Sequence, residues 1–352
     1  RAAAVLKRYL SWIDLRLAAN RNLVKILTDG LGGASPGSSE EEDPTDRTLL
    51  AVECAGCLGE IIGRGMDERK KLALLTELDV FGALCRYSGL NVGGAAAIAA
   101  GGTLDLVNTD ATQIEAVAAA AELISAAGLE LIQGWELEFA ERTTNAQMEQ
   151  CVELAMACLA YDSIDVSGPA VDLISRILAS LEKRAERWKS LNDDDAICDK
   201  IMSRTLIIIH LRTKYPDDFR FDHEDEEEAE EELYRARLRK LYQRVVRPRP
   251  DLALQFVGRC LSSLPPPLSS RPAPEVEAAL RLVYHYSEGR RPAPGARTAL
   301  RDAPFREMVD ALHRSDVSRH PHREVLLLYY DISVRYSGLL KEDPELLTLF
   351  LG

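Results

Sequence analysis

Apolar residues recur every three to four positions along almost the whole chain, which is the period of an amphipathic helix. Strand-like alternation with a period of two is nearly absent. The chain is therefore expected to be all-α, with about a dozen helices. The expected helices are residues 3–17, 21–31, 48–64, 68–87, 112–134, 145–161, 167–191, 192–215, a basic helix ending at Pro248, 251–264, 274–288, 302–314, 322–340 and a short last helix capped by Asp343.

These helices come in pairs that repeat after about 40 residues, the period of HEAT and armadillo repeats, in which each helix pair stacks only on its neighbours. The fold class is accordingly predicted to be a HEAT/armadillo-like α-solenoid of antiparallel helix pairs. We expect residues 1–352 to form one continuous solenoid segment without separate domains. Five stretches rich in Gly, Pro, Ser or acidic residues predict flexible loops, near 30–47, 89–111, 216–232, 264–274 and 289–301.

The strongest departure from even polarity is a charge switch at residues 217–249. Eleven acidic side chains and one basic one lie between Asp217 and Glu232, and seven basic and no acidic ones between Arg235 and Arg249. The acidic part contributes −10 to a net charge of −13, so the rest of the chain carries only −3. The acidity is therefore local and does not exclude a nucleic-acid partner.

The basic part of the switch predicts a helix with two different faces. One arc of about 100° is apolar and is expected to pack inward; it contains Tyr234, Leu238, Leu241, Tyr242 and Val245. A narrow stripe far from that arc is cationic; it contains Arg237, Lys240, Arg244 and Arg247. The acidic part is expected to be a loop before this helix, near the positive end of the helix dipole.

The sequence contains no phosphate-binding loop, dinucleotide fingerprint, zinc-protease motif or serine-hydrolase elbow. No nucleophile or base can be named, so we expect no enzyme, no cofactor, no metal and no small-molecule substrate. Cys54 and Cys57 form a lone CxxC without a second ligand pair, and buried thiols are favoured over zinc. Residues 193–195, three aspartates, are interpreted as a helix cap rather than a metal site.

No apolar run of 18 residues predicts membrane insertion. The chain begins with Arg1 in mid-pattern and stops within an apolar helix, so it is interpreted as a piece of a longer polypeptide.

Five segments, in the same order, resemble the exportin-T family of tRNA export receptors, within the importin-β (karyopherin) superfamily. They are SWIDLRLAANRNLV (11–24), CLGEIIGRGMDERKKLALL (57–75), the charge switch with Leu233-Tyr234-Arg235, EVEAALRLVYHYSE (275–288) and the block from Phe305 to Leu340. Departures are Arg64 in place of the usual Lys, Glu122 and Ser125 in place of Lys and Asn, and two Gly-rich insertions near 32–39 and 89–102.

The resemblance implies a HEAT-repeat nuclear export receptor that binds tRNA cooperatively with the GTP form of the small GTPase Ran. It implies passage through the nuclear pore in contact with nucleoporins, and shuttling between nucleus and cytoplasm. The piece would lack the first repeats and most of the C-terminal arch. A generic HEAT-repeat protein scaffold without RNA cargo is the alternative.

A-form RNA is read by shape and phosphates, so spaced cations are the candidate tRNA contacts. They are Arg69, Lys70, Lys71, Arg184, Arg187, Lys189, Arg237, Lys240 and Arg244. An ordinary solvated face is the alternative for each of them. For the acidic run three interpretations stay open: a solvated loop, a docking site for the GTPase, or a segment that repels misplaced nucleic acid or folds back on the basic helix. The candidate GTPase contacts are Asp222, Glu224, Asp225, Glu226, Glu227 and Glu228.

Overall fold

The structure is a computed structural model, and it is all-α. It describes residues 2–13, 20–32, 44–86, 90, 106–107, 113–137, 142–187, 192–216, 219–221, 226–290 and 296–351. Over these residues there is no β-strand, only an isolated bridge between Val107 and Tyr161. The expected all-α class is confirmed.

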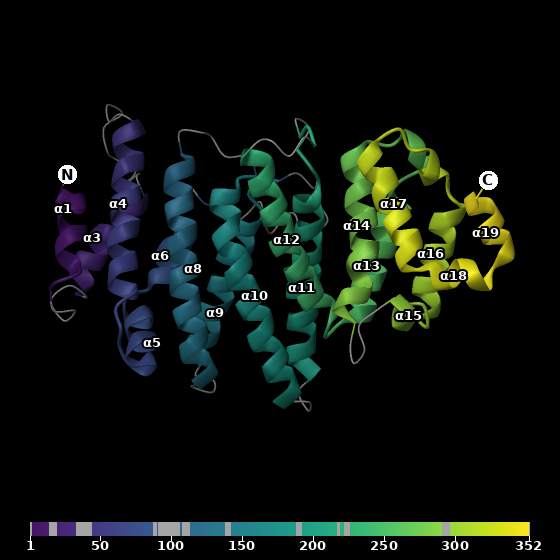
Figure 1. Cartoon of the computed structure of the whole chain (residues 1–352). Coiled ribbons are helices and arrows are strands. Elements are labelled where there is room, and N and C mark those ends of the chain that lie inside the picture. Colours follow the sequence, from purple (N-terminus) through teal and green to yellow (C-terminus); the bar gives the residue numbers. More distant parts are fainter. Residues whose placement is uncertain are drawn as a thin grey trace. The chain divides into compact units, whose positions relative to one another are not determined.

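The chain divides into two compact units, Arg1–Arg184 and Ala185–Gly352. In the first unit α4 packs against α1, α3 and α8, and α8 in turn packs against α5 and α9, so neighbours in the chain lie side by side (Figure 1). The helices of this unit are α1 (Ala2–Leu10), α3 (Arg21–Gly32), α4 (Pro44–Ile62), α5 (Glu68–Glu77), α6 (Val80–Arg86), α8 (Ile114–Leu137), α9 (Arg142–Leu159) and α10 (Ile164–Arg187), whose last turn crosses the boundary.

Close helix packing in the first unit depends on a glycine in α8. A Cβ atom on Gly128 would lie 2.6 Å from Leu173 of α10 and 2.9 Å from the sulfur of Cys151 of α9. Any side chain at this position would therefore push α8 away from both neighbours.

The second unit is arranged around α14 (Ala273–Gly289), which packs against α11, α12, α13, α15 and α17. Two buried tyrosine hydroxyls fix it: Tyr242 donates to the carbonyl of Leu282 at 3.1 Å, and Tyr336 donates to that of Val283 at 3.0 Å. The other elements are α11 (Asn192–Thr213), α12 (Glu226–Val246), α13 (Pro250–Ser263), α15 (Ala296–Ala299), α16 (Ala303–Arg314), α17 (Arg323–Arg335), α18 (Ser337–Glu342), α19 (Pro344–Leu351) and the 3-10 turns at Leu268–Ser270 and Asp316–Arg319.

In each unit, helices that are neighbours in the chain pack against each other, which confirms the HEAT-like helix-pair fold. That both units continue one solenoid over residues 1–352 stays a prediction.

Three expected helices are shorter than the apolar pattern suggested. The helix expected at 3–17 ends at Leu10 and is followed by a turn at residues 11–13. The helix expected at 68–87 is broken between α5 and α6 at Asp79, which has φ 47°. The helix expected at 322–340 ends at Arg335 and gives way to α18. None of these breaks contains a Gly or Pro, the residues that mark such breaks in a sequence.

The loop expectation near 216–232 is wrong in its second half, because Glu226–Glu232 form the first two turns of α12. The expected loop at 289–301 contains the short helix α15, and that at 264–274 a 3-10 turn. The Gly-rich stretches at residues 33–43 and 91–105 lie outside the described residues.

The cysteines are free thiols, and only Cys85 is partly exposed. Burial raises the pKa of Cys54 to about 11 and that of Cys151 to about 12, as buried and unreactive thiols require. Among the described residues no group of side chains could hold a metal ion, and none of the described helices combines the length and apolarity needed to cross a membrane.

Candidate nucleic-acid interface on α12

The apolar face of α12 is the part of the charge switch that fixes its position. The five side chains expected to face inward are all at most 1% exposed; they are Tyr234, Leu238, Leu241, Tyr242 and Val245. The prediction of this packed face is confirmed. The charges also follow the helix, since glutamates fill its first turn and Arg244 lies in its last, the order that the helix dipole favours.

Arg235 of α12 is buried although it belongs to the basic part of the switch. Its guanidinium donates to both carboxylate oxygens of Glu277 of α14, at 2.8 and 2.9 Å, and to the carbonyl of Thr213. It also lies 3.6 Å from the ring centre of Tyr215. Arg281, one turn along α14 from Glu277, donates to the same carboxylate at 2.6 Å. Glu277 therefore joins two arginines and ties α12 to α14.

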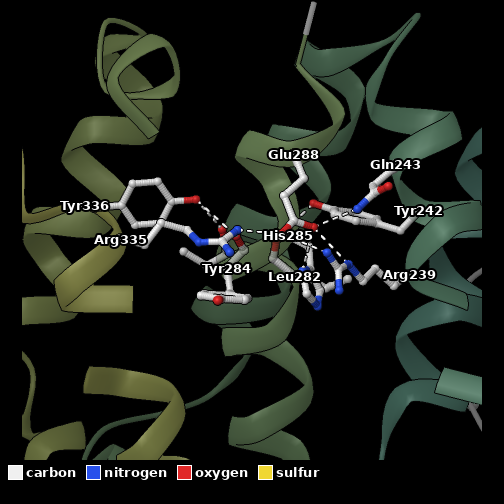
Figure 2. A network of polar contacts seen from close by, with 10 residues as sticks. Arg239, Tyr242, Gln243, Leu282, Tyr284, His285, Glu288, Arg335 and Tyr336 are labelled. Carbon is white, nitrogen blue, oxygen red and sulfur yellow. Dashed lines mark hydrogen bonds and ion pairs between the residues drawn. The ribbon is translucent and has the colours of Figure 1, made fainter. Parts of the chain in front are cut away.

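Glu288, at the other end of α14, is the centre of a second polar network (Figure 2). Arg239 and Gln243 reach it from α12, with shortest distances of 3.0 and 2.7 Å. Arg335 reaches it from α17 at 2.7 Å, and His285 of α14 itself at 2.9 Å. One carboxylate thus holds three helices together.

The donors around Glu288 decide its charge. Burial would raise the pKa of this carboxyl, but hydrogen bonds from His285 and Arg335, with the charge of Arg239, lower it to about 2. Burial lowers the pKa of His285 although Glu288 opposes that shift. Glu288 is therefore ionised at neutral pH and attracts the cations around it.

A cavity of about 290 Å³ lies between α11, α12, α14 and α17. Arg235, Arg239 and Arg281 line it, but Glu277 and Glu288 already pair with them. Glu232 and Asp331 add further negative charge to its walls. The cavity is not a cationic site, so a polyanion would meet α12 on its outer face instead.

Three of the four residues of the expected cationic stripe lie on α12, whereas Arg247 follows its last residue, Val246. Lys240 is exposed, and Arg237 and Arg244 are partly exposed. Lys240 and Arg244 form no ion pair with any described residue. These side chains lie outside the apolar arc, and Lys240 lies farthest from it.

The acidic residues of the switch divide into two groups. Glu226 and Glu227 are exposed in the first turn of α12. Glu228 is only 6% exposed and accepts hydrogen bonds from the backbone N–H groups of Arg220 and Phe221, at 2.5 and 3.0 Å. Its carboxylate is thus used inside the fold. Asp222, Glu224 and Asp225 lie outside the described residues.

The candidates of the first unit also divide. Asp67 caps α5 by accepting from the backbone N–H groups of Arg69 and Lys70, whose side chains are exposed. Lys71 is only 4% exposed and pairs with Glu130 of α8 at 3.0 Å. It holds α5 on α8 and cannot also reach a bound ligand without leaving Glu130 unpaired. Arg184 and Arg187 lie on α10, but their side chains, like all of Lys189, are outside the described residues.

The residues of α14 that hold α12 were not predicted from the sequence. Glu277, Arg281, His285 and Glu288 recur every three to four residues in α14. Charged groups with helical spacing inside an apolar helix indicate a buried polar face. That signal was available in the segment 275–288.

Comparisons with known proteins agree with the resemblance in the sequence. The family model described as Exportin-T matches residues 139–352, more than half of the chain. The chain belongs to the exportin-T family. The match spans α12 and both carboxylates of α14.

Individual members of the exportin-T family match almost the whole chain. The chain is 27% identical over 353 residues to Exportin-T of Mus musculus, which covers 97% of the chain and 32% of that protein. It is 25% identical over 354 residues to Exportin-T of Homo sapiens, with the same coverage. It is 27% identical over 369 residues to Exportin-T of Oryza sativa subsp. japonica, covering 98% of the chain and 32% of that protein. The chain thus spans about a third of the length of these curated relatives.

Proposed function

We propose that the chain is part of a nuclear export receptor that binds tRNA together with the GTP form of the small GTPase Ran. The observation that carries this proposal is the cationic stripe on the outer face of α12, in a chain of the exportin-T family. The role is binding and transport, and it involves no catalytic group or cofactor.

The stripe has the chemistry that a folded RNA requires. Arg237, Lys240 and Arg244 extend over about 10 Å of helix, at 1.5 Å per residue. Duplex RNA offers phosphates and 2′-hydroxyls rather than readable base edges, so cations on a rigid helix are sufficient for contact. The two carboxylates of α14 supply that rigidity by fixing Arg235 and Arg239 on the flank of the same helix.

In the first unit we propose Arg69 and Lys70 as further tRNA contacts. Both lie in the first turn of α5, where the helix dipole disfavours cations. Local helix stability therefore does not explain them, whereas a polyanionic ligand would. Arg184, Arg187 and Lys189 remain candidates from the sequence, and the buried Lys71 is left out.

We assign the GTPase to the acidic start of α12. Glu226 and Glu227 are exposed there, and Asp222, Glu224 and Asp225 precede them in the chain. Glu228 is left out because its carboxylate accepts backbone hydrogen bonds within the fold. Contact with nucleoporins and shuttling between nucleus and cytoplasm are further parts of the proposal.

The test is binding of fluorescently labelled tRNA to this chain over a series of salt concentrations, with and without GTP-bound Ran. The affinity of a receptor that neutralises several phosphates falls steeply with salt. The slope of log affinity against log salt concentration is about −0.7 to −0.9 per phosphate. Because coupling between two ligands is reciprocal, Ran-GTP should also raise tRNA affinity. A generic protein scaffold would show neither effect, and that outcome would overturn the proposal.

A further inference from the structure

A cavity of about 210 Å³ in the second unit has no part in RNA binding as proposed above. It lies where the segment after α11 meets the first turns of α14 and α17. Its lining is mostly apolar and aromatic; it consists of Tyr215, Pro216, Phe219, Phe221, Ala273, Pro274, Glu277, His322 and Glu324.

The aromatic walls of this cavity are held in place. The rings of Tyr215 and Phe219 have centres 4.5 Å apart, and those of Phe221 and His322 are 4.9 Å apart. The hydroxyl of Tyr215 donates to Glu232 at 2.8 Å, and the backbone N–H of Phe221 donates to Glu228 at 3.0 Å. Phe221 has φ 61°, a conformation that a phenylalanine rarely adopts and that the surrounding structure imposes.

The carboxylates around the cavity favour a positively charged ligand. Glu324 lies on its wall and forms no ion pair within the described part of the chain. Glu226 and Glu227 are exposed at the start of α12, beside the Glu228 that holds Phe221. An anion would be repelled here, whereas a cation would gain a carboxylate and aromatic faces together.

The same cluster already binds one cation within the fold. The guanidinium of Arg235 lies 3.6 Å from the ring centre of Tyr215 and pairs with Glu277, another residue of the cavity wall. Phe219, Phe221 and Glu324 again place rings beside a carboxylate, and no cation of the described residues is among those that line the cavity.

We propose that this cavity binds an arginine or lysine side chain from a basic segment of a partner protein. The aliphatic stem lies against Phe219, Phe221 and Pro274, and the charged head pairs with Glu324. Long cationic side chains combine these two properties, an apolar stem and a charged end. The cavity is independent of the proposed tRNA contacts. A negative result in the peptide test would therefore leave the proposed export function unaffected.

The test uses two fluorescein-labelled peptides that differ only in charge. One carries three arginines separated by glycine and serine, and its twin carries citrulline, which is nearly isosteric and neutral. We expect the arginine peptide to bind this chain at least about tenfold more tightly, a difference that one buried ion pair with ring contact can supply. A third peptide with leucine at the same positions tests for an apolar anchor.

Site variants separate the cavity from general attraction by a chain of net charge −13. Glu324→Gln and Phe219→Leu should each remove most of the preference for the arginine peptide. Glu307→Gln, which removes an exposed carboxylate of α16, should leave it unchanged. Unfolding curves of all three variants establish that each is folded.

Three results would overturn the proposal. These are equal binding of the arginine and citrulline peptides, binding that Glu324→Gln and Glu307→Gln reduce alike, and tighter binding of the leucine peptide.

Discussion

Helix α12 carries cations on two of its faces, and they have different surroundings. Arg235 and Arg239 point to α14 and pair with Glu277 and Glu288. Lys240, which is exposed, and Arg244, which is partly exposed, lie off that face and form no ion pair with a described residue. The two sets alternate within three turns of one helix, so residue type does not distinguish them. Their angle around the helix does, together with the carboxylates on the neighbouring helix.

One helix can thus separate stability from binding by using different faces for each. Arg235 is 5% exposed and depends on Glu277, so truncating it should destabilise the second unit, whereas Arg239 pairs with Glu288 but its side chain is 48% exposed. Lys240 is exposed and Arg244 is partly exposed, and neither has an ion-pair partner among the described residues, so truncating them should cost little stability and weaken only a polyanionic ligand. Each prediction below tests that separation.

The largest effect is expected for Arg235→Ala. The side chains of Arg235 and Glu277 are 5% and 2% exposed, so the variant leaves a buried carboxylate whose remaining ion-pair partner among the described residues is Arg281. The free energy of unfolding should fall by about 3 kcal/mol, the lower end of the range for breaking a buried pair. Urea unfolding followed by circular dichroism measures it. Lys240→Ala, from the same helix, is the control and should change stability by less than about 0.5 kcal/mol.

The second effect concerns Glu288 and pH. Its pKa is lowered to about 2 from the usual 4.5 of a glutamate, so the carboxylate stabilises the fold above pH 4.5. That contribution is lost as the pH falls from 4.5 toward 2, because protonation then favours the unfolded chain. Because Glu288 is partly exposed, we expect the free energy of unfolding to fall by about 2 kcal/mol over this pH range.

The matched variant for this prediction is Glu288→Gln, which keeps the shape and removes the charge. At pH 7 it should be less stable than the wild type by about the same 2 kcal/mol. Between pH 4.5 and 2 its stability should change less than that of the wild type. Parallel pH profiles of the two proteins would show that Glu288 does not act through its charge.

The third effect should appear in binding and not in stability. Replacing Arg237, Lys240 and Arg244 together by alanine should lower tRNA affinity about tenfold and reduce the salt slope by about two. The unfolding midpoint should change far less than in Arg235→Ala. The control replaces three exposed cations of the same unit that lie off α12: Arg301, Arg319 and Lys341. If both triple variants lose affinity equally, the outer face of α12 is not the interface.

The fold of α12 was predictable in part. Its apolar arc follows from a period of 3.6 residues, and all five expected residues are buried. Its acidic start was interpreted as a loop because dense negative charge is typical of solvated segments. Glu228 is buried because it accepts hydrogen bonds from the backbone N–H groups of Arg220 and Phe221. Sequence periodicity does not show such contacts.

The candidate site was predictable to a similar extent. The outward position of Lys240 and Arg244 follows from the helical wheel alone. The partners of Arg235 and Arg239 lie more than 40 residues away on α14, so only the packing of helices reveals them. Lys71 could have been recognised as buried, because it lies four residues before the fully buried Leu75 and so shares its face of α5.

The smallest effect is expected in the first unit, where the buried Lys71 and the exposed Lys70 are adjacent residues of α5. Lys71 pairs with Glu130, whose side chain is 26% exposed and can regain water when the pair is lost. Lys71→Met should therefore cost only about 1 kcal/mol, whereas Lys70→Met should change the free energy of unfolding by less than about 0.5 kcal/mol. For tRNA binding the order should reverse, with Lys70→Met reducing the salt slope by about 0.8 and Lys71→Met leaving it unchanged. Loss of affinity in Lys71→Met at unchanged stability would contradict the assignment of inward and outward cations, because a buried lysine would then be contacting the ligand.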